Sequence, residues 1–259
     1  MAKTLSTYTI VRNGIEFQYP FLECARSCLG VAEQVVFVVG VDGDGDDDGT
    51  LQALTDLQDE VGDKLRLIVK FWTPPHKAVF AEFKEAGRRA CTGNWNIRID
   101  ADEVIHEKDY HIIRALIRAN VRAYRFPQIR FYRDYFTEIT SEADAGGYMY
   151  LYNADHVRFT GIRHEFQEVN LDGLVYPDTK HQFDTGSVIP QVRVFHYWGV
   201  KDKEVMGRKC DEIELQMKGG DWETRENYEW EFEDRMREWS GDHPAVMEER
   251  IKEWMSRNR

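Results

Sequence analysis

Three acidic residues stand directly after a predicted strand near the middle of the chain. Asp100, Asp102 and Glu103 follow Trp95–Ile99, a run typical of a strand. Because a strand points alternate side chains to one side, we expect Asp100 and Asp102 to converge just beyond its end. Two carboxylates placed there repel each other unless hydrogen bonds or a cation offset their charge. Since Mg²⁺ or Mn²⁺ takes protein carboxylates together with phosphate oxygens, the segment indicates a metal and phosphate site.

A second acidic cluster, from Asp42 to Thr50, follows the apolar run Gln34–Val39. In the frame that starts at Asp44, an EF-hand calcium loop needs a glutamate at its twelfth position, where this chain has Thr55. An EF-hand loop also follows a helix, whereas this cluster follows a predicted strand. Aspartates just before a helix stabilise its first turn, so capping of a helix that begins at Thr50 explains part of the cluster.

The first hundred residues alternate predicted strands and helices. Strands are predicted at Tyr8–Val11, Gln34–Val39, Leu65–Val69 and Trp95–Ile99, and helices at Phe17–Leu29, Thr50–Val61 and Lys77–Cys91. Strands separated by helices of this length indicate βαβ units and a parallel sheet. Ligands bind beyond the carboxyl ends of the strands in such sheets. Both acidic clusters lie at such ends, and this coincidence is the strongest functional signal in the sequence.

The second half of the chain changes in character after a predicted helix at 109–119. Short aromatic strands are predicted at Ala123–Phe126, Ile129–Tyr132, Tyr148–Tyr152, Val157–Thr160, Leu174–Tyr176 and Val192–His196. From Asp202 onward the pattern is helical, with stripes Tyr228, Phe232, Met236, Trp239 and Met247, Ile251, Trp254, Met255. The expected fold class is therefore α/β, with a Rossmann-like, mostly parallel sheet flanked by helices, an antiparallel extension that shapes a cleft, and a C-terminal helical segment.

Composition excludes several classes of protein. The 259 residues include 46 acidic and 34 basic side chains, for a net charge of −12, which argues against a broad nucleic-acid-binding surface. No run approaches the roughly 20 apolar residues of a transmembrane helix, and the first residues lack the apolar core of a signal peptide. The four cysteines have no zinc-binding spacing, so reduced thiols are expected. These features predict a cytoplasmic protein without a transmembrane segment.

Three further segments match a known pattern: Arg12-Asn13 with Tyr19–Glu23, Asp48-Gly49-Thr50, and Phe195-His196-Tyr197. Together with the acidic segment Trp95–Glu107, they resemble the inverting glycosyltransferases of family 2, which bind nucleotide sugars on the GT-A fold. The resemblance extends from about Thr7 to about Lys209, and the acidic segment, similar to the family's DXD motif, is its most specific part. It implies a GT-A domain over residues 1–200, with a nucleotide-sugar half at 1–103 and an acceptor half at 104–200, before a helical segment at 201–259.

The resemblance implies that a divalent ion, Mn²⁺ or Mg²⁺, bridges the diphosphate of the donor. Such an ion stabilises the negative charge that develops when the sugar–phosphate bond breaks. Asp102 and His196 are the expected ligands, and Asp100 either joins them or binds the ribose or a metal-bound water. The alternative for His196 is a half-buried strand histidine whose imidazole is satisfied by the protein.

The nucleotide is expected to lie against further residues of the matching segments. Alignment on Asp48-Gly49-Thr50 places Asp44 at the base- or ribose-binding position, and Arg12 belongs to the opening pattern of the family. Lys201 and Lys209 would meet the diphosphate as point charges. The alternative for both lysines is an ordinary place on a helix surface.

Inversion by direct displacement also needs a general base that deprotonates the acceptor hydroxyl. The resemblance favours Glu165, which stands beside Arg163 and His164 on a predicted loop. Asp144 is the second candidate. An ordinary salt-bridged surface position is the alternative for Glu165.

The sequence thus predicts an enzyme that transfers a sugar from a nucleoside diphosphate donor, with UDP as the expected nucleotide. The acceptor is unknown and could be a glycan, a lipid-linked glycan, a protein or a modified nucleobase; the oligomeric state is also open. One alternative is a nucleotidyltransferase, for which Arg12-Asn13-Gly14 is a poor substitute for a Gly-rich triphosphate loop. The other is a non-catalytic carbohydrate- or calcium-binding module on the same fold.

Overall fold

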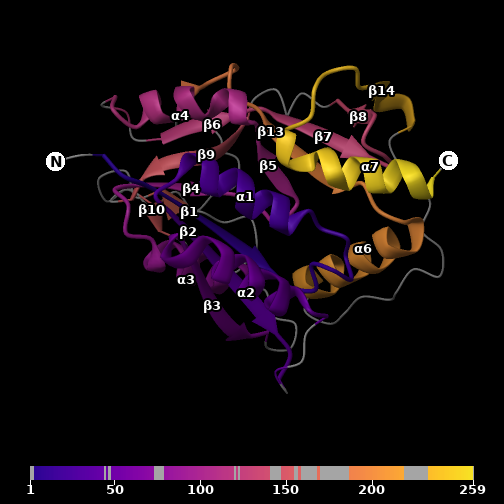
Figure 1. The fold of residues 1–259 in the computed structure, drawn as a ribbon, viewed down its shortest axis with the longest axis horizontal. Coiled ribbons are helices and arrows are strands. Elements are labelled where there is room, and N and C mark those ends of the chain that lie inside the picture. The colour runs from indigo at the N-terminus through magenta and orange to yellow at the C-terminus, as the bar shows by residue number, and fades with distance from the viewer. Residues whose placement is uncertain are drawn as a thin grey trace.

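A computed structural model describes residues 3–43, 45, 48–72, 79–119, 121, 123–140, 147–154, 157–158, 168–169, 187–218 and 233–258. Within these ranges the chain forms one seven-stranded sheet, a five-stranded sheet beside it, and a short pair of strands (Figure 1). The pair consists of β10 (Val157–Arg158) and β11 (Glu168–Val169). The predicted strand at 174–176 lies outside the described residues.

The large sheet has the strand order β12-β6-β9-β4-β1-β2-β3. Its parallel centre consists of β1 (Leu5–Val11), β2 (Gln34–Val41), β3 (Leu65–Phe71) and β4 (Trp95–Arg98). The other strands are β6 (Ala123–Phe126), β9 (Tyr148–Asn153) and β12 (Ser187–Val188). Only the pairs that β9 makes with β4 and β6 are antiparallel. The predicted α/β class, with a mostly parallel sheet and an antiparallel extension, is confirmed.

Helices cover both faces of the parallel strands. α1 (Phe21–Val31), α2 (Thr50–Val61) and α4 (Tyr110–Leu116) share one apolar core, whereas α3 (Val79–Ala90) packs on the opposite face. Alternate residues of β2 divide between the two cores: Phe37 packs with α1 and α2, and Val38 packs with α3. A strand buried on both faces needs apolar side chains at every position, which explains the uninterrupted apolar run in this part of the sequence.

The start of the first helix differs from the sequence prediction. The predicted helix began at Phe17, but α1 begins at Phe21, directly after Pro20. Proline disfavours the helical conformation in the residue before it, so Tyr19 cannot continue a helix into Pro20. Gln18 instead adopts a positive φ of 54° in the preceding turn. This turn carries Tyr19 to the functional site described below.

The second sheet has the order β14-β8-β7-β13-β5. Its strands are β5 (Glu103–Ile105), β7 (Gln128–Tyr132), β8 (Thr137–Ile139), β13 (Val194–Gly199) and β14 (Met236–Glu238). The register of β13 against β5 places His196 opposite Glu103. The remaining helices that the structure describes are α6 (Lys203–Lys218) and α7 (Glu248–Arg257). Short 3₁₀ helices lie elsewhere along the chain, at Gly62–Lys64, Glu107–Asp109, Glu233–Arg235 and Ala245–Met247.

The C-terminal region is partly helical. The predicted helical stripe is wrong at Met236, which lies in β14 opposite Ile139 of β8; Tyr228 and Phe232 are outside the described residues. Backbone pairing with an available sheet edge has overridden the helical periodicity here. The second stripe is confirmed, because Ile251 and Trp254 pack α7 onto the second sheet. α7 also lies beside the start of α1 (Figure 1), where Arg250 donates hydrogen bonds to the Gln18 and Tyr19 carbonyls at 3.0 and 3.1 Å.

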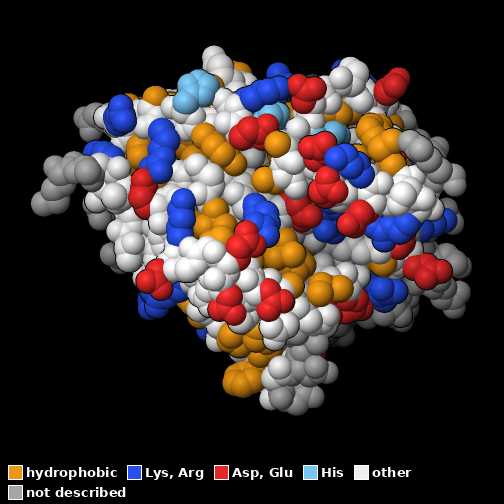
Figure 2. All heavy atoms as spheres, viewed as in Figure 1, with side chains coloured by type: hydrophobic (Ala, Val, Ile, Leu, Met, Phe, Trp, Pro, Cys, Tyr) orange, Lys and Arg blue, Asp and Glu red, His pale blue; other side chains and the backbone are white. Residues whose placement is uncertain are grey.

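Three surface and composition features complete the description. Acidic and basic side chains are interspersed over the face shown in Figure 2, with no broad basic area on that face. The cysteines are free thiols, and Cys24 and Cys28 lie on the buried face of α1. Among the helices that the structure describes, none has the length and apolar character needed to cross a membrane.

Candidate functional site

A cavity of about 410 Å³ opens beyond the carboxyl ends of β1 and β4. Arg12 follows β1 and lines the cavity together with Arg98, at the end of β4, and the acidic segment Asp100–Glu103. β2 and β3 lie on one side of β1 in the sheet, whereas β4 lies on the other. Open α/β sheets bind ligands at such a reversal of strand order, because the connecting loops separate there. The predicted location of the acidic segment Asp100–Glu103 at a ligand-binding edge agrees with this geometry.

Asp102 is a buried carboxylate of the site. Its side chain is 9 % exposed, its Oδ2 accepts a hydrogen bond from Lys209 Nζ at 2.8 Å, and its Oδ1 lies 3.4 Å from His196 Nε2. Burial alone would raise the pKa of Asp102, but the Lys209 ammonium and His196 reverse this, and the net pKa lies well below its ordinary value. Asp102 is therefore held as an anion.

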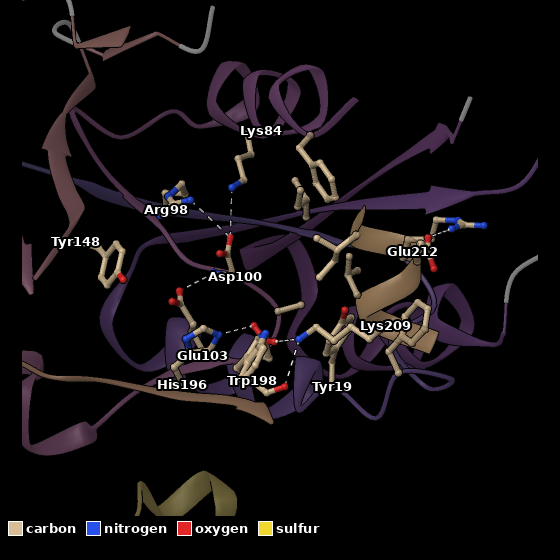
Figure 3. A pocket seen from close by; sticks show the side chains of 18 of the residues that line it. Tyr19, Lys84, Arg98, Asp100, Glu103, Tyr148, His196, Trp198, Lys209 and Glu212 are labelled. Atoms are coloured by element: carbon tan, nitrogen blue, oxygen red, sulfur yellow. Dashed lines mark hydrogen bonds and ion pairs between the residues drawn. The ribbon is translucent and has the colours of Figure 1, made fainter. Parts of the chain in front are cut away.

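Asp100 has looser surroundings. Its side chain is 38 % exposed, and its Oδ1 lies 3.7 Å from Lys84 Nζ and 3.8 Å from a guanidinium nitrogen of Arg98 (Figure 3). Burial would raise its pKa, but the nearby Lys84 and Arg98 charges give a net lowering. Burial also lowers the pKa of Lys84 to about 8, despite the Asp100 carboxylate. Asp100 is thus an ionised carboxylate with a face open to the cavity.

Glu103 is the last residue of the acidic segment, and hydrogen bonds hold its carboxylate. Its Oε1 accepts hydrogen bonds from Tyr150 Oη and Gln128 Nε2, both at 2.5 Å, and its Oε2 accepts the backbone N–H of Asp100 at 2.8 Å. Burial and the neighbouring Asp100 carboxylate raise its pKa. With 1 % of its surface exposed, Glu103 positions the segment and does not present itself to a ligand.

Arg12 marks the opposite wall of the cavity. Its guanidinium donates to Asp42 at 2.7 Å and pairs with Glu212 of α6, and it lies 5.6 Å from the ring centre of Trp72. Burial raises the pKa of Glu212, which Arg12 only partly offsets. Trp72 and Phe80, whose rings meet edge to face, line this wall together with Arg12, so aromatic side chains stand beside a cation here.

Two buried lysines meet at Tyr19. Lys209 and Lys201 are 4 % and 5 % exposed, and their ammonium nitrogens lie 4.8 and 4.7 Å from the ring centre of Tyr19. Lys209 is fixed by Asp102 and by the Trp198 carbonyl at 3.3 Å. Lys201 Nζ has no hydrogen-bond partner among the described residues. Burial lowers the pKa of Lys201 well below its ordinary value, and Lys209 lowers it further.

The structure brings together most of the predicted site residues that it describes. Arg12, Asp100, Asp102, His196 and Lys209 line one cavity. Lys201 adjoins them across Tyr19, and neither lysine is an exposed helix-surface residue. Asp44, Asp144 and Glu165 lie outside the described residues, so their roles stay predictions.

Asp48 is not among the residues that line the cavity, and its carboxylate is bound by the nearby Thr50. Its Oδ1 accepts hydrogen bonds from the Thr50 backbone N–H at 3.1 Å and from the Thr50 hydroxyl at 2.5 Å. Gly49, between them, adopts a φ of +93°, which favours glycine. This geometry agrees with a role for Asp48 at the start of α2.

The predicted metal ligands do not fit a divalent ion as they lie. Lys209 and His196 face the two oxygens of Asp102, while Asp100 faces Lys84 and Arg98. Among the described residues, no three His, Cys, Asp or Glu side chains gather as a ligand set. The ammonium group of Lys209 occupies the position beside Asp102 where a metal ion would bind. Metal binding therefore stays a prediction from the sequence.

Lys84 and Arg98 are site residues that the sequence analysis missed. Lys84 falls on the same stripe of α3 as Phe80, Phe83 and Gly87, so helical periodicity placed it toward the core. Arg98 and Asp100 are two residues apart, so strand alternation placed both on one side. Both signals were present in the sequence. A basic residue on a buried stripe indicates a site only when its acidic partner is known, and the structure identifies Asp100 as that partner.

Comparison with known proteins gives limited information. No protein-family model matches the chain, and no curated protein matches its sequence. Among solved structures, residues 1–349 of S. aureus TarS match with 13 % identity and a TM-score of 0.49, over 85 % of this chain and 67 % of that one. The same fragment in complex with UDP-GlcNAc matches with 14 % identity and a TM-score of 0.47, over 85 % and 68 % of the two chains.

A longer TarS structure matches with 14 % identity and a TM-score of 0.47, and the alignment covers 85 % of this chain and 41 % of that chain. These values describe a partial similarity between the backbone folds. No residue role follows from them.

Proposed function

We propose that this chain binds a nucleoside diphosphate sugar in the cavity and transfers the sugar to an acceptor hydroxyl. The observation that carries the proposal is the convergence, at the strand-order reversal beyond β1 and β4, of an open carboxylate, enclosed cations and aromatic side chains. A nucleotide sugar needs these three kinds of surface: hydrogen-bond acceptors for its hydroxyls, cations for its phosphates and a flat apolar wall for its base.

Each surface has an assigned part of the donor. The wall of Trp72 and Arg12 suits the base, because an aromatic face and a guanidinium plane both stack on planar rings. Asp100 presents an ionised, partly exposed carboxylate to the hydroxyls of the ribose or the sugar. Lys209 lies on the wall between them, where the diphosphate would pass.

The proposed reaction is a direct displacement at the anomeric carbon. The acceptor oxygen forms a bond to that carbon, the bond to the phosphate oxygen breaks, and its electron pair stays on the nucleoside diphosphate. The acceptor proton passes to a general base, for which Glu165 and Asp144 are the predicted residues. Inversion and the identity of the base both stay predictions, as does the bound Mn²⁺ or Mg²⁺ expected from the sequence.

Thermal unfolding with a panel of nucleotides tests the binding step. A ligand that binds only the native state raises the unfolding midpoint, so UDP, UDP-sugars and other nucleoside diphosphates are compared with and without Mn²⁺. We expect UDP to raise the midpoint of the wild-type chain and to have a reduced effect on Asp100→Ala. Asp59→Ala, an exposed acid on α2, is the matched control and should behave as wild type.

Product formation tests the transfer step. With a UDP-sugar that stabilises the chain, we expect slow release of UDP by transfer to water, and faster release when an acceptor glycan mixture is added. A chain that binds none of the nucleotides would overturn the proposal. Turnover of nucleoside triphosphates with release of pyrophosphate would instead assign the site to a nucleotidyltransferase.

A further inference from the structure

The carboxylate that would anchor a metal already holds a lysine. Lys209 donates to Asp102 at 2.8 Å and to the Trp198 carbonyl at 3.3 Å, and both partners are enclosed by the protein. An ammonium group has three N–H donors, so these two contacts leave one of them for a ligand. Lys209 also lines the cavity, so its remaining N–H donor and its positive charge are available to a ligand there.

Lys201 is a second buried ammonium with unused donors. It is 5 % exposed, and its Nζ has no hydrogen-bond partner among the described residues. Burying an ionisable group without a partner is costly, and a folded protein keeps such a group where a ligand completes it. The missing partner of an ammonium group is an anion.

Lys209 and the ring of Tyr19 line the cavity, whereas Lys201 does not line it and lies against Tyr19. The two ammonium nitrogens lie 4.7 and 4.8 Å from its ring centre, and the ring lines the cavity. Attraction between a cation and the face of an aromatic ring holds each ammonium group in place without consuming its donors. Hydrogen bonds from Arg250 fix the backbone of the turn that carries Tyr19. The arrangement is therefore rigid before any ligand arrives.

We propose that Lys201 and Lys209, held on the ring of Tyr19, neutralise the diphosphate of the donor in place of a divalent metal ion, so that nucleotide binding needs no metal. The inference rests on the proposed function, because it assigns the diphosphate to the same cavity. Lys209 supplies one positive charge, and a bound diphosphate favours the protonated form of Lys201, so that the two lysines then supply two charges, as a divalent ion would. They stabilise the charge left on the diphosphate when the bond to the sugar breaks. Asp102 acts as the positioning residue of Lys209.

Calorimetric titration of the full chain with UDP tests the inference directly. The titration is made after removal of metals with EDTA and repeated with excess Mn²⁺. We expect the two dissociation constants to agree within about threefold. UDP binding only in the presence of Mn²⁺ would overturn the inference and leave the proposed function standing. No binding of any nucleoside diphosphate under either condition would overturn both.

Lys201→Met separates a ligand-binding lysine from a structural one. We expect its affinity for UDP to fall at least about tenfold, with affinity for uridine unchanged because uridine has no phosphate. The same variant should unfold at higher urea concentration than wild type, because an unpaired buried charge has been removed. Equal losses for UDP and uridine, or an unchanged UDP affinity, would contradict the assignment.

Lys209→Met leaves Asp102 buried without its partner, which by itself destabilises the fold, so it is paired with Asp102→Asn in a double variant. The double variant keeps a neutral site and should lose UDP affinity at least about tenfold in EDTA, with uridine binding retained. Lys252→Met, an exposed lysine of α7, is the matched control and should bind UDP as wild type does. Wild-type UDP affinity in the double variant would exclude Lys209 from the diphosphate site.

Discussion

Asp100 and Asp102 stand two residues apart in one segment and have different surroundings. Asp102 is 9 % exposed and in direct contact with Lys209, whereas Asp100 is 38 % exposed with its two cations at 3.7 and 3.8 Å. The first carboxylate has its charge matched by the protein, and the second keeps an open face. A pair of acids that looks symmetrical in the sequence therefore divides into one residue that is held by the protein and one that stays open to the cavity.

The largest expected effect of this difference is on stability. Asp102→Ala leaves the Lys209 ammonium buried and unpaired, and we expect a loss of about 3–5 kcal/mol in the free energy of unfolding. Asp100→Ala should lose less than about 1 kcal/mol, because its ion pairs are long and partly exposed to solvent. Urea unfolding followed by circular dichroism measures both. Equal losses would show that the two carboxylates are not distinct.

Lys84, on the Asp100 side, is expected to give the next largest effect. Its pKa in the folded chain is about 8, below its ordinary value of 10.5, so between these pH values the unfolded chain binds a proton that the folded chain does not. Stability therefore rises with pH through this window, and the cost of burying the charge is fully present below it. We expect Lys84→Met to be more stable than wild type at pH 7 by on the order of 2 kcal/mol.

That advantage should shrink as the pH is raised from 8 to 10, because wild-type Lys84 loses its proton in the folded state. Urea unfolding of both chains across this range measures it. A constant difference between them would contradict a lowered pKa for Lys84.

At Asp100 the expected effect is on ligand binding and not on stability. Asp100→Asn should weaken UDP-sugar binding by about tenfold, equivalent to about 1.4 kcal/mol, while the fold is retained. Calorimetry measures this, with far-ultraviolet circular dichroism as the check on folding. Unchanged affinity would place the ligand hydroxyls against another wall of the cavity.

The smallest expected effect belongs to the acidic cluster from Asp42 to Thr50. Asp48→Ala removes hydrogen bonds at the start of α2 and should cost about 1 kcal/mol in the free energy of unfolding. UDP affinity should not change, because Asp48 does not line the cavity. A selective loss of UDP binding in this variant would return Asp48 to the nucleotide pocket and weaken the distinction between the two clusters.

The sequence by itself determined the parallel half of the fold. The apolar run of β2 and the stripe of α2 are local patterns, and each produced an element close to its predicted bounds. The strand-end position of Asp100 and Asp102 followed from the same patterns, since alternation along a chain needs no knowledge of its partners. The helix start at Phe21 was also encoded locally, in Pro20.

Only the tertiary structure decided what the acidic segment contacts. The pairing of β13 with β5 brings His196 to Glu103, and α6 carries Lys209 to Asp102, across a separation of 107 residues. Likewise, β14 forms because the edge of β8 is available to it. Contacts between segments so far apart depend on how the whole chain packs, so periodicity along the sequence cannot specify them. The charge that faces Asp102, a metal ion or a lysine, is a property of that packing.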